Sequence, residues 1–328
     1  MKLTVIKKLF CAVRTAAALI IAGSVAGSIA GNALAPAAGA APLRVVATTP
    51  DLAALAVAVG GDDIALTTLA RPHEDPHFVD ARPSFLRALN RADLLITGGA
   101  DLEDGWLPPL TRNARNGKIL EGGTGRFDAG AHVKLRDVPA VLDRSQGDVH
   151  AHGNPHFLLD PANAARVATA LAEKIGTIAG TAGDAPAGER VRARAKKFAD
   201  TLAAKHADWR RRLAPYRDAG VVTYHRSYDY LLAAFDLRLT GTVEPKPGIE
   251  PSASHLLALA AQMKRDKVRL ILAEPNRPAR TCSRLATDAG ATLLRLPIMP
   301  PTPDYLAFME QNIRALETAL KRPSTERV

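Results

Sequence analysis

The segment IALTTLARPHEDPHFVDARPSF, residues 64–85, contains an apolar run, two closely spaced histidines and three prolines. Its first seven residues have the composition of a β-strand, and the residues from Pro83 onward predict a helix. A proline-rich loop therefore connects a strand to a helix. This strand–loop–helix order is typical of a parallel α/β sheet.

The loop contains His73, Glu74 and His77 in the order H-E-x-x-H, the sequence signature of zinc metalloproteases. That chemistry needs a helix, because only helical spacing places both imidazoles on one face. Pro76 lies inside the motif, where it would destabilise a helix by about 3 kcal/mol through a lost donor and a steric clash. The segment therefore predicts a loop that can bind metal, and argues against a protease helix.

Strand and helix patterns alternate on both sides of this segment. LRVVATT (43–49) precedes it as an apolar strand, and KILEGG (118–123) follows as an expected short strand. Residues 161–216 show only helical patterns, and the alternation restarts at GVVTYH (220–225). The sequence thus predicts an α/β fold of two lobes, each a mostly parallel sheet covered by helices, joined by one long rigid linker helix.

The first forty residues predict an export signal. The basic start MKLTVIKK leads into a weakly apolar stretch rich in Gly and Ala, and a small-x-small pattern favours cleavage near Ala40. A retained membrane anchor is the alternative. We expect a periplasmic protein without stable membrane insertion after cleavage. Its expected parts are a signal peptide at 1–40, an N-terminal lobe at 41–185, a linker helix at 186–216 and a C-terminal lobe at 217–328.

Charge and cysteine content narrow the function classes. The net charge is +10, or +6 without the four basic residues of the leader, and the chain has no long Lys/Arg run. This pattern gives no indication of nucleic-acid binding. Cys282 is the single cysteine after the leader, so the mature chain has no intrachain disulfide and no cysteine cluster for a metal.

Three histidines in separate segments are placed to meet. Ligands of open α/β sheets bind beyond the carboxyl ends of the strands, so two facing lobes would form a cleft there. His77 follows the strand at 64–70, His225 ends GVVTYH, and His156 precedes the helix that begins near residue 161. We therefore expect the three imidazoles to face one cleft between the lobes.

Several motifs, in order along the chain, point to a known family: HFVDARPS (77–84), NPHFLLDPANA (154–164) and VVTYHRSYDYLLAAFDL (221–237). From about residue 43 to 320 the chain resembles the metal-binding solute receptors of zinc and manganese ABC transporters. The resemblance implies two α/β lobes bridged by a rigid helix, with one metal ion in the cleft. It also implies an ABC permease as partner and His77, His156 and His225 as ligands. We expect a monomer.

The identity of the metal and the fourth ligand are less determined. Neutral imidazole suits zinc, whereas manganese prefers more carboxylate, so Zn²⁺ is expected, with Mn²⁺, iron or another divalent ion as alternatives. The family commonly supplies an Asp after the last strand of the second lobe, but LPIMPPTP (296–303) contains none. Glu274 is the predicted substitute. Its alternative role is to anchor the following loop, and a water molecule can also complete the shell.

Other segments keep two interpretations. His150 and His152 either collect metal for the cleft or belong to a short polar loop. His73 either assists His77 or stays apart, because Pro76 makes joint chelation awkward. The proline-rich segment 244–252 either lines the cleft or meets the permease.

The expected function is capture of a divalent metal ion, zinc in the first place, and its delivery to an ABC permease for import, without enzymatic activity. Affinity is expected to fall below about pH 6.5, where imidazoles become protonated. Two other classes remain open. One is a secreted zinc hydrolase with Glu74 or Glu274 as general base. The other is a metal buffer or adhesin of the same fold that has no permease.

Overall fold

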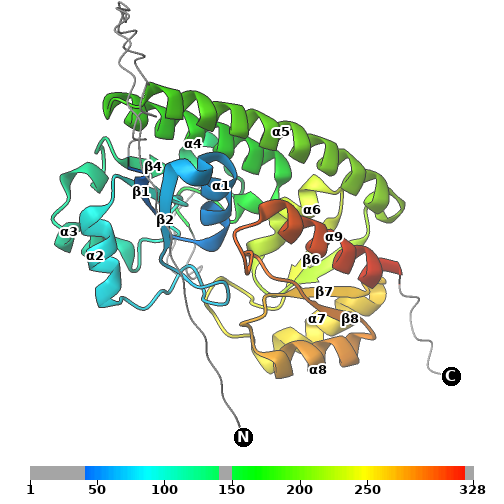
Figure 1. Cartoon of the computed structure of the whole chain (residues 1–328). Coiled ribbons are helices and arrows are strands. Elements are labelled where there is room, and N and C mark those ends of the chain that lie inside the picture. Colours follow the sequence, from blue (N-terminus) through cyan, green and yellow to red (C-terminus); the bar gives the residue numbers. More distant parts are fainter. Residues whose placement is uncertain (1–40, 140–149, 322–328) are drawn as a thin grey trace, which may run out of the picture. The chain divides into compact units, whose positions relative to one another are not determined.

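The computed structural model describes residues 41–139 and 150–321 (Figure 1). The predicted signal peptide at 1–40 lies outside the described residues. Within the described stretches, no helix combines the length and the apolar character needed to cross a membrane.

The N-terminal lobe is built on a parallel four-stranded sheet with the order β2-β1-β3-β4. Its two inner strands are almost wholly apolar, as expected for strands that helices cover on both faces. Because all pairings are parallel, the carboxyl ends of the four strands share one edge of the sheet. The strands are β1 (Leu43–Ala47), β2 (Ile64–Thr68), β3 (Leu94–Thr97) and β4 (Arg126–Asp128), and the helices are α1 (Pro50–Gly60), α2 (Pro83–Arg91) and α3 (Leu107–Asn113).

The C-terminal lobe repeats this arrangement. Its parallel sheet has the order β6-β5-β7-β8, so the first strand of each lobe is again an inner strand. The two sheets confirm the predicted α/β fold. The strands are β5 (Gly220–Thr223), β6 (Arg238–Thr242), β7 (Leu270–Ala273) and β8 (Thr292–Arg295), and the helices are α6 (Asp229–Ala234), α7 (Ala253–Arg265), α8 (Ala279–Ala289) and α9 (Tyr305–Lys321).

Two long helices connect the lobes. Asp160 caps α4 (Pro161–Thr181) by accepting a hydrogen bond from the amide of Ala162, and Asp184 caps α5 (Ala185–Leu213) in the same way. α4 packs against α5, and α5 runs along both lobes (Figure 1). At 29 residues, α5 is about 43 Å long. The expected long linker helix is therefore present, with α4 packed along it.

A single buried apolar cluster extends through both lobes. It includes Val45 of β1, Phe157 before α4, Trp209 of α5, and Leu270 and Met309 of the C-terminal lobe. Separating the lobes would expose this shared core to water, at about 25 cal/mol for each Å² of apolar surface. The packing therefore favours small shifts between the lobes over wide opening.

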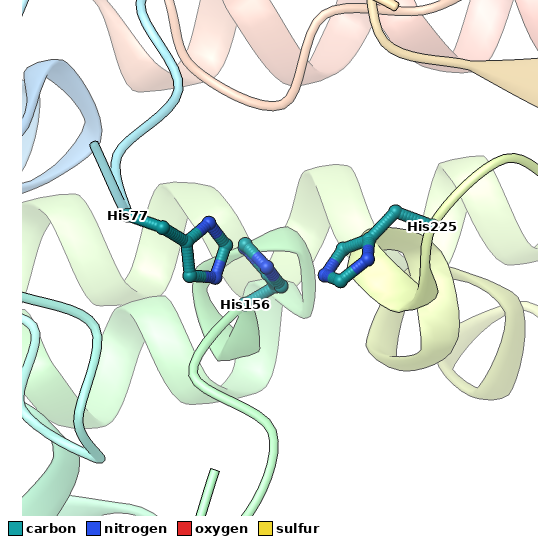
Figure 2. Close-up of side chains that lie close together, drawn as sticks. All are labelled: His77, His156 and His225. Atoms are coloured by element: carbon teal, nitrogen blue, oxygen red, sulfur yellow. The ribbon is translucent and has the colours of Figure 1, made fainter. Parts of the chain in front are cut away.

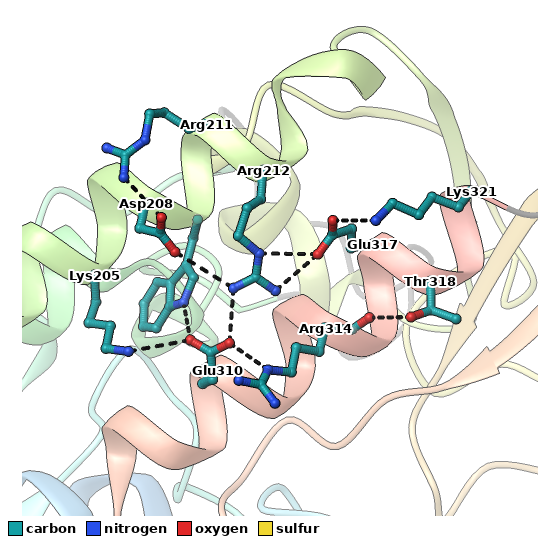
Figure 3. Close-up of polar contacts among 10 residues, drawn as sticks. Lys205, Asp208, Arg211, Arg212, Glu310, Arg314, Glu317, Thr318 and Lys321 are labelled. Carbon is teal, nitrogen blue, oxygen red and sulfur yellow. Dashed lines mark hydrogen bonds and ion pairs between the residues drawn. The ribbon is translucent and has the colours of Figure 1, made fainter.

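Ion pairs fasten the last helix to the linker (Figure 3). Arg212 of α5 donates hydrogen bonds to Glu310 at 2.9 Å and to Glu317 at 3.0 Å, both on α9. The indole of Trp209 also donates to Glu310, and this bond, with Arg212 and Arg314 beside it, lowers the pKa of Glu310 to about 2. α9 is thus held to α5 by both apolar and charged contacts.

One predicted strand is wrong. KILEGG (118–123) begins inside a short 3-10 turn, Gly117–Ile119, and the fourth strand lies further on, at Arg126–Asp128. The side chain of Asn116 accepts a hydrogen bond from the amide of Lys118 and starts the turn. Gly122 then adopts a φ of 72°, which is incompatible with a strand.

Candidate metal centre

His77 is presented by the loop at 69–82, which follows β2. The loop contains no helix, so the prediction that H-E-x-x-H is not a protease helix is confirmed. Trp106 donates a hydrogen bond to the carbonyl of Pro76 at 3.0 Å and fixes the loop just before His77. Glu74 is held by the amide of Arg71 and the guanidinium of Arg82. The glutamate of the motif is therefore engaged within its own loop.

Asp75 orients the ring of His77. Its carboxylate lies 2.7 Å from Nδ1 of His77 and also accepts from the His77 amide at 3.1 Å. Because a carboxylate only accepts, Nδ1 carries the proton and the lone pair is on Nε2. Burial opposes ionisation of Asp75, but the hydrogen bond to His77 and the charge of Arg277 outweigh it and hold its pKa well below the usual range.

His225 is held in the same manner in the other lobe. It lies just after β5, and its Nδ1 is 2.8 Å from a carboxylate oxygen of Glu244, just after the neighbouring strand β6. Thr223 is paired with Thr242 in the parallel strands β5 and β6. His225 and Glu244 each come two positions after these paired residues, so they lie side by side. Nε2 of His225 is therefore also free to bind a metal.

His156 lies immediately before a 3-10 turn that leads into α4. Its amide donates to the side chain of Asn154 at 3.0 Å, and Asn154 donates in turn to the carbonyl of Arg226 at 2.8 Å. The segment that carries His156 is thus fastened to the C-terminal lobe, beside His225. Nε2 of His156 is buried and has no hydrogen-bond partner. Burial, together with the neighbouring imidazoles, lowers the pKa of His156 well below its usual value and keeps the ring neutral.

These three predicted ligands converge on one point (Figure 2). Each offers one nitrogen, and these atoms all lie within 4.8 Å of one another. The ring centroids are 5.1 Å apart for His77 and His156, and 5.6 Å apart for each pair that includes His225. Around a tetrahedral zinc ion with bonds of 2.0–2.1 Å, ligand nitrogens are about 3.4 Å apart. Small movements would therefore close the three rings around an ion.

His150 lies against this cluster; from the sequence it either collects metal for the cleft or belongs to a short polar loop. Its Nε2 lies 3.1 Å from Nε2 of His77, and the two rings are stacked with centroids 5.1 Å apart. Burial lowers the pKa of His150 to about 4, with a contribution from the nearby His77 and His225. Only its closeness to His156 in the chain was visible beforehand. His152, in contrast, points to Asp101 at 2.6 Å and is largely exposed.

Glu274 has other partners. Ser227 donates to one of its oxygens at 2.5 Å, and Nε of Arg277 lies 3.6 Å from the other. Among the described residues, the metal-binding group contains the three histidines without Glu274. Its role as fourth ligand stays a prediction, and the observed contacts agree with the alternative role of anchoring the following loop.

Two neighbouring cavities of about 450 and 250 Å³ open onto the cluster. Both are lined by His150 and His225, while the larger also reaches His156 and the smaller His77. Residues 245–247 line the larger cavity, so the segment 244–252 borders the cleft. An ion can thus reach the three histidines from solvent.

Charge around the histidines favours a divalent cation. Three carboxylates, those of Asp75, Glu244 and Glu274, surround a single guanidinium, Arg277, at 3.4 to 3.6 Å. The formal charges of these four groups sum to −2, beside the histidine cluster. A doubly charged ion would balance them, and neutral imidazoles are suitable ligands for it.

Two similar lobes that enclose a histidine cluster define the class of metal-binding solute receptors. The family model described as "Zinc-uptake complex component A periplasmic" (ZnuA) matches residues 45–319, and the chain belongs to this family. It is 26% identical over 263 residues to the high-affinity zinc uptake system protein ZnuA of Yersinia pestis, covering 73% of this chain and 78% of that protein.

Solved structures share the fold. A zinc-bound ZnuA deletion mutant superposes with a TM-score of 0.72 and 19% identity, covering 86% of this chain and 99% of the other. The protein FpvC of Pseudomonas aeruginosa, in complex with Mn²⁺, gives a TM-score of 0.70 at 24% identity, covering 85% and 98%.

Proposed function

We propose that this protein is a periplasmic receptor that binds one divalent metal ion, zinc, through His77, His156 and His225, and delivers it to the permease of an ABC importer. The observation that carries the proposal is the convergence of three imidazole nitrogens, from three segments and both lobes, within 4.8 Å. Because the ligands come from both lobes, metal binding depends on how the lobes are arranged. A permease can then distinguish the metal-loaded from the metal-free receptor by this arrangement.

Zinc fits this donor set best. Neutral imidazoles rank among the preferred ligands of zinc, whereas manganese favours carboxylate and water. We propose His150 for the fourth position, because its Nε2 is 3.1 Å from that of His77; it lies outside the group of three nitrogens and would move towards His156 and His225 to bind. This gives a tetrahedral set of four nitrogens. Glu274, whose second oxygen is buried without a hydrogen-bond partner, remains the alternative for this position.

The protein acts as a carrier and not as a hydrolase. A zinc hydrolase needs a general base beside the metal. Glu74 is tied to Arg71 and Arg82, and Glu274 is tied to Ser227 and Arg277. Glu74 is therefore engaged within its own loop, and Glu274 is bonded through one oxygen to Ser227 while its other oxygen, near Arg277, makes no hydrogen bond.

Export precedes function. Residues 1–40 direct the chain to the periplasm and are removed near Ala40, which leaves the lobes at 41–185 and 217–328 with the linker at 186–216. The mass of the protein recovered from the periplasm checks this cleavage. Protein found in the membrane fraction with a mass that retains residues 1–40 would support a membrane anchor instead.

Binding and growth experiments test the proposal. The chelator-stripped protein is titrated with Zn²⁺ and with Mn²⁺ in competition with an indicator. We expect tight binding of one zinc ion and weaker binding of manganese. A strain that lacks the gene should grow poorly under zinc chelation and recover with added zinc. Tight binding without any growth defect would favour a metal buffer or an adhesin, and absence of binding would contradict the proposal.

A further inference from the structure

Arg277 lies at the centre of the carboxylates that surround the metal centre. It follows β7, and its guanidinium is 3.4 Å from Asp75, 3.5 Å from Glu244 and 3.6 Å from Glu274. Asp75 belongs to the N-terminal lobe, and the other two belong to the C-terminal lobe. The side chain is only 19% exposed. One partly buried cation therefore joins acidic groups of both lobes.

Two of these carboxylates are the partners that orient candidate ligands. Asp75 binds Nδ1 of His77, and Glu244 binds Nδ1 of His225. Arg277 thus contacts the carboxylate partners of two histidines that belong to different lobes. Partners of this kind fix the tautomer and the direction of a metal-binding imidazole.

Arg277 is itself held in place. Its guanidinium lies over the ring of Tyr224, 5.4 Å from the centroid. Its amide donates to the carbonyl of Glu274 at 3.1 Å, and its carbonyl accepts from Arg295 at 2.9 Å. The planar guanidinium holds its donors in a fixed fork that suits several carboxylates, whereas the ammonium of lysine is a compact charge on a flexible stem.

We propose that Arg277 is a positioning residue that couples the Asp75–His77 pair of one lobe to the His225–Glu244 pair of the other, so that the metal centre is assembled before the ion arrives. This inference rests on the proposed metal-binding function.

Charge and position predict opposite effects at this residue. A positive charge close to the site repels a metal ion, and the charge of Arg277 contributes to the low pKa of His156. If charge alone mattered, Arg277→Met would bind zinc more tightly. If positioning dominates, Arg277→Met and Arg277→Lys both bind zinc more weakly, although lysine keeps the charge.

The test uses the protein purified from the periplasm and stripped of metal. Zinc affinity is measured for wild type, Arg277→Met, Arg277→Lys and Arg284→Met. Arg284 is an exposed arginine paired with Asp288 on α8 and serves as the matched control. We expect affinity to fall about 10- to 100-fold in both Arg277 variants, the range known for partners of metal ligands, and to be unchanged in the control.

A spectroscopic readout separates positioning from general stability. Co²⁺ replaces zinc as a probe, because its visible absorption is strong in tetrahedral sites and weak in sites of higher coordination. We expect weaker absorption in both Arg277 variants, at saturating Co²⁺ and with circular dichroism like that of wild type. If Arg277→Met does not fold, Arg277→Lys and Asp75→Asn carry the test.

A double-mutant cycle shows whether Arg277 acts through Asp75. The Asp75→Asn and Arg277→Lys losses should not add, because both break the same chain of contacts. Tighter binding in Arg277→Met, wild-type affinity in Arg277→Lys, or full additivity would overturn the inference while leaving the receptor function intact. A wild-type protein that binds no metal would overturn both.

Discussion

The two lobes orient their ligands with the same chemical unit, built in two different ways. In the N-terminal lobe, Asp75 and His77 are two residues apart in one loop. In the C-terminal lobe, His225 and Glu244 are 19 residues apart and meet because β5 and β6 are paired. In the N-terminal unit, the side chains of His77 and Asp75 are 14% and 19% exposed. In the C-terminal unit, those of His225 and Glu244 are 8% and 7% exposed.

This difference shows what each unit depends on. The first depends on the local shape of a proline-rich loop that Trp106 fixes, and the second on the register of a buried sheet. The loop can adjust to an arriving ion more easily than the sheet edge. We therefore infer that the C-terminal unit is the rigid half of the site and the N-terminal unit the adaptable half.

The largest effects are expected from the ligands themselves. His225→Ala should weaken zinc binding by more than about 100-fold, beyond the usual loss for an outer partner. His77→Ala and His156→Ala should also weaken it strongly, and competitive titration measures all three. His255→Ala is the control, because His255 bonds the carbonyl of Thr242 and is outside the cluster. Near wild-type binding in His225→Ala would contradict the claim that both lobes supply ligands.

The next effects separate the two carboxylates. Glu244→Gln should weaken zinc binding by about 100-fold and Asp75→Asn by about 10-fold, because the more buried and rigid unit has less freedom to recover. The same titrations give both values. The reverse order would mean that the loop, and not the sheet edge, is the rigid half.

A pH experiment extends the comparison to the histidines without a carboxylate partner. His150 has a pKa lowered to about 4, mainly by burial, so its protonated form is less stable in the folded than in the unfolded protein. The unfolded state then binds more protons, and the metal-free protein should lose stability as pH falls from about 6.5 towards 4. Urea unfolding at pH 7 and pH 5 measures the loss.

The matched variant for this experiment is His150→Gln, in which the fall in stability with pH should be smaller. An equal fall in both proteins would mean that His150 is not held neutral in the cleft. The lowered pKa values of His150 and His156 also change the expectation for metal binding, because protons compete for these two rings only at a pH well below the 6.5 expected from the sequence.

The smallest effect on metal binding is expected far from the cleft. Arg212→Met removes the contacts of Arg212 with Glu310 and Glu317, leaves those of Trp209 and Lys205 with Glu310, and should lower stability by about 1 kcal/mol. Zinc affinity should not change. Thermal unfolding and titration check the two parts, with Arg211→Met as control, since Arg211 is 71% exposed and pairs only with its own helix neighbour Asp208 among the contacts described. A marked loss of affinity would show that the linker helix helps to shape the site.

The sequence was sufficient for the fold and for the meeting of three histidines in the candidate site. Continuous apolar runs alternating with helical segments predict parallel sheets, and the ends of β2 and β5 are where His77 and His225 were expected. It failed at KILEGG, where an asparagine cap and a glycine with positive φ decide the conformation locally. Apolar content alone did not reveal that turn.

The supporting groups could not be read from the sequence. Arg277, Asp75 and Glu244 are far apart in the chain and meet only when the lobes are assembled. Residue patterns report which side of an element is buried, and not which loop faces it from another lobe. His150 was noticed for its neighbours in the chain, but His77, which it contacts, is 73 residues away in the sequence.

The most direct test of the central claim is a crystal structure of the zinc-loaded protein, with the metal located by anomalous scattering at the zinc edge. The account predicts one strong peak in the cleft, bound by Nε2 of His77, His156 and His225 at about 2.0–2.1 Å. A peak elsewhere, or a peak whose ligands all come from one lobe, would contradict it.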